Sequence, residues 1–242
     1  MKTWPRQHVL TVIAIALTFA SGAADVASFT RLGDVFTSVM TGNIVLWGLA
    51  VARGSLTLAS HTAVAVAGYI AGVAVGTWVA HGTKQADADP GADVLPAHVV
   101  WVLLAQLTLL AGFTVGWEVT GTSPAGWAQF SLLATLAAAM GVQSSAVNDM
   151  GLTQVSTTYL TGTLTGLVSS LASPGQDTQQ GARRFGVLIG LVAGASLCGL
   201  FVATAARAVP ALPLAALVTT LVLATGPGWR LERGPERARP DG

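Results

Sequence analysis

Charged side chains are scarce in this chain. Only 10% of its 242 residues are Asp, Glu, Lys or Arg, whereas 52% are hydrophobic. A soluble domain usually carries about 25% charged residues, and the mean hydropathy here is +0.63. This composition excludes an ordinary soluble domain and indicates an integral membrane protein, with the lipid bilayer as its first partner. The net charge of +1 gives no reason to expect nucleic acid as a partner.

Cysteines and catalytic motifs are also nearly absent. The single cysteine, Cys198, lies inside an apolar run, which excludes an internal disulfide and a cysteine metal cluster. The four histidines lie near the ends of apolar segments, where an interfacial position is favoured over metal ligation. The sequence contains no GxSxG, no HExxH, no phosphate-binding glycine loop with a lysine and no paired carboxylates. We therefore expect no metal, no cofactor and no enzymatic activity.

Apolar runs dominate what is present. A helix needs about 20 apolar residues to cross a bilayer, and we compared with that length the runs at 9–28, 60–80, 99–117, 127–147, 185–206 and, shorter, 212–226. The part of the first run at 9–20 follows Lys2 and Arg6 and precedes SGAAD, so it also resembles a secretory signal peptide. We favour a transmembrane helix, because the second half of the chain has an equivalent helix at 130–147.

Two short apolar stretches with polar beginnings resemble each other. They read TSVMTGNIVLWGLAVARG, residues 37–54, and TTYLTGTLTGLVSSLAS, residues 157–173. Thr37, Thr41, Gly42 and Ala52 match Thr157, Thr161, Gly162 and Ala172 at a constant offset of 120 residues. A fixed period of this kind predicts an internal duplication. We expect one membrane repeat at 1–122, a second at 123–229 and a charged, disordered cytoplasmic tail at 230–242.

These two stretches are marginal in length for crossing a membrane. Irregular backbone at membrane depth occurs only where protein or a wet cavity surrounds it, so we expect broken or re-entrant helices. With six crossings the halves would be inverted relative to each other, and with eight they would be parallel. Lysines and arginines place both termini in the cytoplasm, nine against three, in either case. We favour six crossings.

The sequence thus predicts an all-α integral membrane protein with about six transmembrane helices and two short broken or re-entrant helices, built as an internal duplication. The localisation that we expect is the bacterial plasma membrane, with several passes.

The polar beginnings of the two short helices are the first candidate site. They contain Thr41, Gly42 and Asn43 in one half and Thr161, Gly162 and Thr163 in the other. Glycine permits a backbone break or a close approach, and the start of a helix inside a membrane offers unpaired N–H groups to a ligand. The alternative is a helix-packing motif whose hydroxyls bond to their own backbone.

Asp25 and Gln143 are the other candidates. A carboxylate in a membrane span costs about 2.5 to 3.5 kcal/mol on insertion scales, so Asp25 is either a proton or cation site or a cap at the membrane interface. Gln143 lies within the equivalent span of the second half and is expected to form a hydrogen bond across the core. The position equivalent to Asp25 is Ser144 or Ser145, so the carboxylate occurs in one half only.

The segments GAADVASFTRLGDVFTSVMTGNIVLWGLAVARG and AAAMGVQSSAVNDMGLTQVSTTYLTGTLTGLVSSLA resemble the YoaK-like (DUF1275) family. Its members are bacterial membrane proteins of about this length and of unknown function. The resemblance extends from Thr11 to about Gly226 and rests on the TGN and TYxTGT signatures. It implies a plasma-membrane protein with about six helices and supplies no substrate or reaction. One departure is Ser144 after Gln143, where an asparagine is expected.

Two main functional hypotheses follow from these patterns, and a third, an intramembrane enzyme, would need a nucleophile–base pair that the sequence does not show. The first is a small secondary transporter or channel that binds a small solute or ion between the two TG-containing helices, near the middle of the membrane. The second is a membrane assembly or sensor protein that transports nothing. Glycine-rich faces at 68–76 and 186–194 also lead us to expect a homo-oligomer.

Overall fold

The computed structural model describes residues 6–84, 94–150, 160–172 and 178–225, and leaves the side chains of residues 6, 160, 171–172 and 178–179 undescribed. All the regular structure in these ranges is helical. The helices are α1 (Arg6–Arg31), α2 (Met40–Arg53), α3 (Leu56–Thr83), α4 (Ala97–Thr120), α5 (Trp127–Asp149), α6 (Leu160–Ala172), α7 (Thr178–Thr204), the short 3-10 helix η2 (Ala206–Ala208) and α8 (Ala211–Thr225). The expected tail at 230–242 lies outside the described residues.

Six segments are long and apolar enough to cross a membrane. They are α1, α3, α4, α5, α7 and α8 together with η2. α2 and α6 have only 14 and 13 residues, so each is about 20 Å long and shorter than the roughly 30 Å hydrocarbon core of a bilayer. Large apolar side chains such as Leu56, Trp78 and Trp127 are exposed on the outside of the bundle. The prediction of an all-α membrane protein with six spans is confirmed.

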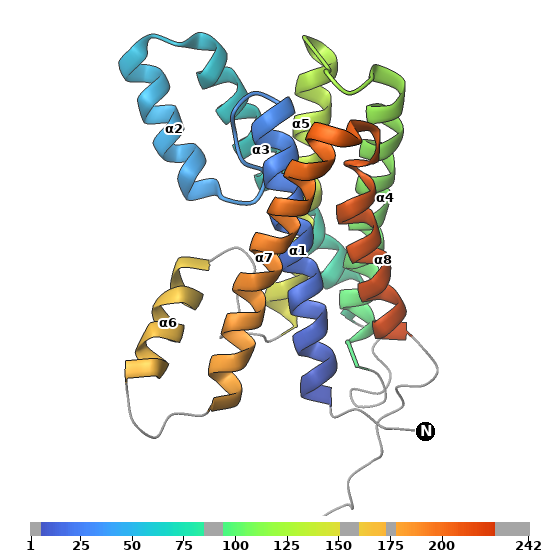
Figure 1. The fold of residues 1–242 in the computed structure, drawn as a ribbon. Helices are drawn as coiled ribbons and strands as arrows, with labels where there is room; N and C mark the ends of the chain where they lie inside the picture. The colour runs from blue at the N-terminus through green and yellow to red at the C-terminus, as the bar shows by residue number, and fades with distance from the viewer. Residues whose placement is uncertain (1–5, 85–93, 151–159, 173–177, 226–242) are drawn as a thin grey trace, which may run out of the picture.

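The spans pack in two corresponding groups. α1 packs against α7 and α8, while α5 packs against α3 and α4. α1 and α5 are the most buried of the spans, so the core of the bundle lies along them. Each short helix packs on the span that follows it, α2 on α3 and α6 on α7. Figure 1 shows that α2 and α6 lie at opposite ends of the bundle.

Glycines bring the backbones of the paired spans into direct contact. At six glycines, an added Cβ would overlap a backbone carbonyl of the facing helix, which shows that the helices touch through their main chains. The four closest pairs are Gly22 of α1 with Leu191, Gly194 of α7 with Phe19, Gly141 of α5 with Tyr69 and Gly72 of α3 with Ala138. The contacts between α1 and α7 are therefore matched, in kind and in spacing, by those between α5 and α3.

The turn from α2 into α3 is built from local signals. Gly54 ends α2 in the left-handed conformation, with φ +63°, which glycine adopts at little cost. Ser55 then begins α3, and its hydroxyl accepts a hydrogen bond from the Leu58 N–H at 3.3 Å. The two helices therefore form a tight hairpin at one end of the bundle.

Candidate functional site

Asp25 holds the connection between α1 and α2. The side chain is 7% exposed, and four donors surround its carboxylate. Thr37 donates to Oδ1 from its N–H at 2.8 Å and from its hydroxyl at 3.1 Å. Ser38 donates to Oδ1 from its N–H at 2.8 Å and to Oδ2 from its hydroxyl at 2.6 Å. The carboxylate therefore caps the turn that leads into α2.

Asn43 holds the same connection from the other side. Its Oδ1 accepts a hydrogen bond from the Phe36 N–H at 2.9 Å, and its Nδ2 donates to the Phe36 carbonyl at 2.7 Å. The side chain is fully buried. Both backbone groups of Phe36 are thus paired with one amide, which fixes the first turn of α2 relative to the chain before it. Asp25 and Asn43 together orient α2.

The residues that precede this connection are packed tightly. Gly33 has φ +109°, and an added Cβ would overlap the ring of His61 in α3. His61 is paired through Nδ1 with the Thr57 carbonyl at 2.7 Å and through Nε2 with Gln129 Oε1 of α5 at 3.2 Å. Gln129 donates to the carbonyl of Arg31 at 3.2 Å. The end of α1 is thereby tied to α3 and α5.

The remaining members of the first TG segment have a different position. Thr41 is exposed, and Gly42 packs beside Phe36 and Val39 without touching Asp25 in any described contact. In the second segment Thr161 and Gly162 are exposed, whereas Thr163 is 4% exposed. The residues that lead into the second segment, 151–159, lie outside the described residues.

The two TG segments begin separate short helices, α2 packed on α3 and α6 packed on α7. Both helices start near mid-height of the bundle and run toward its opposite ends (Figure 1). The physical reason is the number of spans, because three crossings between equivalent positions place equivalent short helices at opposite ends. Asp25 and Asn43 share one connection, while Thr161, Gly162 and Thr163 belong to another part of the molecule.

Gln143 lies in a second polar cluster, inside the bundle. Its Nε2 donates to the Leu17 carbonyl at 3.0 Å and to the Ser21 hydroxyl at 2.9 Å, both on α1. Its Oε1 accepts a hydrogen bond from Gln106 Nε2 of α4 at 2.8 Å. The expected hydrogen bond across the core is present, and it joins three helices.

Gln106 is the site residue that sequence reasoning missed. It is fully buried, and its Oε1 has no hydrogen-bond partner. An unsatisfied buried acceptor costs about 1–3 kcal/mol. The available signal was an isolated amide in an otherwise apolar span, which is expensive in a membrane and for that reason points to a function.

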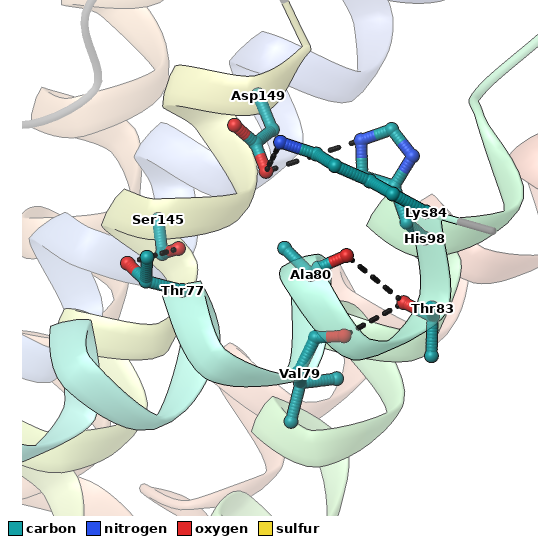
Figure 2. A network of polar contacts seen from close by, with 8 residues as sticks. All are labelled: Thr77, Val79, Ala80, Thr83, Lys84, His98, Ser145 and Asp149. Atoms are coloured by element: carbon teal, nitrogen blue, oxygen red, sulfur yellow. Dashed lines mark hydrogen bonds and ion pairs between the residues drawn. The ribbon is translucent and has the colours of Figure 1, made fainter.

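A third polar group lies where α3, α4 and α5 meet at their ends (Figure 2). Lys84 Nζ lies 3.7 Å from Asp149 Oδ2, and His98 Nε2 lies 3.9 Å from the same oxygen. One turn away, the hydroxyls of Thr77 and Ser145 are 3.3 Å apart. These contacts join the last turns of α3 and α5. Within the described ranges, no group of three or more His, Cys, Asp or Glu side chains could hold a metal ion.

The comparisons with known proteins agree with this architecture. Residues 13–225 match the family model described as "Protein of unknown function (DUF1275)". The chain is 31% identical over 159 residues to the UPF0700 transmembrane protein YoaK of Bacillus subtilis (strain 168), a match that covers 64% of this chain and 64% of that protein. The chain thus matches somewhat less than two thirds of this relative's length. No solved structure matches. By its fold and by the family model that covers most of its length, this multi-pass membrane protein belongs to the DUF1275 family.

Proposed function

We propose that this protein is a small secondary transporter or channel in the plasma membrane, built from two inverted membrane repeats. The single observation that carries the proposal is the matched pair of interfaces, α1 with α7 and α5 with α3. Inverted repeats with interrupted helices are a recurrent construction of secondary transporters, because rocking one repeat against the other opens the two faces in turn.

The arrangement of the spans supports the inverted relation. The spans alternate in direction along the chain, so α1 and α5, which are the first spans of the two expected repeats, cross the membrane in opposite directions (Figure 1). Gly22 lies 119 residues before Gly141, and Gly72 lies 122 residues before Gly194. These four residues occupy equivalent places in the two interfaces, which supports an internal duplication.

The short helices then serve as two gates rather than as one central site. In this proposal α2, held by Asp25 and Asn43, closes the end of the solute path opposite the start of α1 and the end of α8. α6, which begins with Thr161 and Gly162, closes the other end. Arginines and lysines favour the cytoplasm for the end that carries Lys84, Arg183 and Arg184, so α6 would be the cytoplasmic gate.

One observation favours the rival hypothesis of a non-transporting assembly protein. The apolar side chains of Ile44, Val45 and Val51 on α2 are more than half exposed. Such a face can pack against lipid, against a second copy of the chain or against another membrane protein. Under this hypothesis the interior would stay closed from both faces of the membrane.

Single-cysteine labelling in a Cys198→Ala background distinguishes the two hypotheses. We expect Thr41→Cys to react with an impermeant thiol reagent from the outside only, and Thr161→Cys from the cytoplasmic face only. Ser21→Cys, inside the bundle, should react from at least one face. Leu133→Cys is the matched control, since it is fully buried in the apolar core and should stay unlabelled.

The outcomes separate clearly. If both Thr41→Cys and Thr161→Cys react from the same face, the inverted arrangement is wrong. If they react from opposite faces but Ser21→Cys stays as unreactive as Leu133→Cys, the interior is closed and the assembly hypothesis replaces the transporter.

A further inference from the structure

The polar cluster around Gln106 is formed by three spans. One span, α1, packs with α7 and α8, and the other two, α4 and α5, pack with each other. Ser21 comes from α1, Gln106 from α4 and Gln143 from α5. Gln106 lies about 14 Å along α4 from its first residue and about 21 Å from its last. All three side chains are at least nine-tenths buried. The cluster therefore lies well inside the membrane, one turn of α1 away from Asp25.

The orientation of every amide in the cluster follows from one fixed acceptor. The Leu17 carbonyl can only accept a hydrogen bond, so the group of Gln143 that faces it at 3.0 Å must be the Nε2 amide nitrogen. Gln143 Oε1 then points to Gln106, which must present its own Nε2 at 2.8 Å. The orientation is therefore not a free choice between oxygen and nitrogen. Gln106 Oε1 is left as the end of the chain of hydrogen bonds.

The donor groups of the cluster and of the neighbouring turn of α1 are already paired. Gln143 Nε2 donates its two hydrogens to the Leu17 carbonyl and the Ser21 hydroxyl. The hydroxyls of Thr18 and Ser21 donate to carbonyls of their own helix at 2.7 Å and 3.2 Å. The described members of the cluster carry no formal charge. What the site offers is thus a neutral, desolvated acceptor held in place by a fixed network.

From this geometry we propose that Gln106 Oε1 is the anchor of a binding site for a small neutral solute that carries an N–H or O–H donor. A donor from the solute completes the one hydrogen bond that the protein leaves unmade, and a neutral solute avoids placing an uncompensated charge among the amides. This inference rests on the proposed transport function. It places the solute site between α1, α4 and α5 instead of between the TG segments. Binding itself does not depend on transport.

Thermal unfolding of the purified full chain in detergent tests the site with defined probes. Acetamide carries an N–H donor, and N,N-dimethylacetamide has the same acceptor without a donor. We expect saturating acetamide to raise the unfolding midpoint of the wild type by about 3 °C, and N,N-dimethylacetamide to leave it unchanged. Gln106→Met, which keeps the length of the side chain, should abolish the shift. Gln129→Leu is the matched control and should retain it.

Two further results would overturn the proposal. One is that neither acetamide nor glycerol raises the wild-type midpoint. The other is that acetamide stabilises Gln106→Met as much as the wild type, which places binding elsewhere. If Gln106→Met does not fold, Gln106→Asn serves instead, because its amide is one methylene short and should weaken the response at least about tenfold. The binding site and the transport function can fail separately. If acetamide raises the unfolding midpoint but Ser21→Cys stays unlabelled, the binding site is retained and transport is rejected.

Discussion

The sequences that lead into α2 and α6 are similar but carry different polar residues at two equivalent positions. The connection into α2 is held by a carboxylate and an amide, Asp25 and Asn43, which bind backbone groups directly. The matched glycine contacts make Ser144 the counterpart of Asp25, and Thr163 is the counterpart of Asn43. The second half therefore has two hydroxyl side chains, where the first half has the Asp25 carboxylate and the Asn43 amide. We therefore expect the two halves to hold their short helices with unequal strength.

The sharpest test of this comparison is the loss of the carboxylate. Asp25→Ala leaves two backbone N–H groups and two hydroxyls without their acceptor, and buried groups of this kind are costly. We expect the free energy of unfolding to fall by about 3 kcal/mol or more, measured by denaturation in detergent. Ser144→Ala should cost less than about 1 kcal/mol. Equal losses in the two variants would show that the connections are held equally.

The glycine contacts should behave alike in the two halves, in contrast to the connections. Gly72→Val and Gly194→Val each force a side chain into a facing backbone, so each should cost about 2 kcal/mol of stability by overpacking. Gly112→Val is the control, because an added Cβ there meets nothing within 4 Å. A large cost for one glycine and none for the other would contradict the matched interfaces.

Asn43 tests the weaker part of the same connection. Asn43→Ala removes both hydrogen bonds to the Phe36 backbone, and we expect it to lower the free energy of unfolding by about 1–2 kcal/mol. Thr163→Ala should lower it by less, under about 1 kcal/mol. Hydrogen exchange at the Phe36 amide should accelerate in Asn43→Ala while the amides of α5 keep their protection. Unchanged exchange at Phe36 would show that Asn43 does not secure the turn.

The smallest effect is expected for the ion pair of Asp149 at the ends of α3 and α5. The Lys84 side chain is 45% exposed and its nitrogen lies 3.7 Å from the carboxylate. Lys84→Met should therefore change the free energy of unfolding by no more than about 0.5 kcal/mol, and the change should vanish in about 1 M salt. If Lys84→Met lowers the free energy of unfolding as much as Asp25→Ala does, the ion pair of Asp149 stabilises its end of the bundle as strongly as Asp25 stabilises the other end.

The sequence predicted the spans well because length and apolarity decide whether a helix crosses a bilayer. It also predicted that Asp25 faces either a ligand or a cap, but only the fold shows which donors it meets, since Thr37 and Ser38 reach it through a turn. Gln143 was predicted to bond across the core. Its partner Gln106 was missed because a lone amide changes the hydropathy of a span very little.

The meeting of the two TG segments in one central site could not be tested from sequence. Equivalent residues such as Thr41 and Thr161 are close or distant according to the number of crossings between them, and charge distribution gives the same score for six and eight crossings. The packing of α1 on α7 and of α5 on α3 supplies the missing information. It places α2 and α6 in opposite halves of the bundle (Figure 1).

The loop between α4 and α5 follows three spans, α1, α3 and α4. This odd number has a consequence for how the chain is inserted during synthesis. α4 ends at Thr120 and α5 begins at Trp127, so six residues separate them. After α1, α3 and α4 have been inserted, the growing chain is on the face opposite the one where it started. A short loop is then enough to send α5 back through the bilayer. If the two halves are the inverted repeats proposed above, the translocation machinery inserts two similar groups of helices one after the other in opposite orientations, with no additional helix between them.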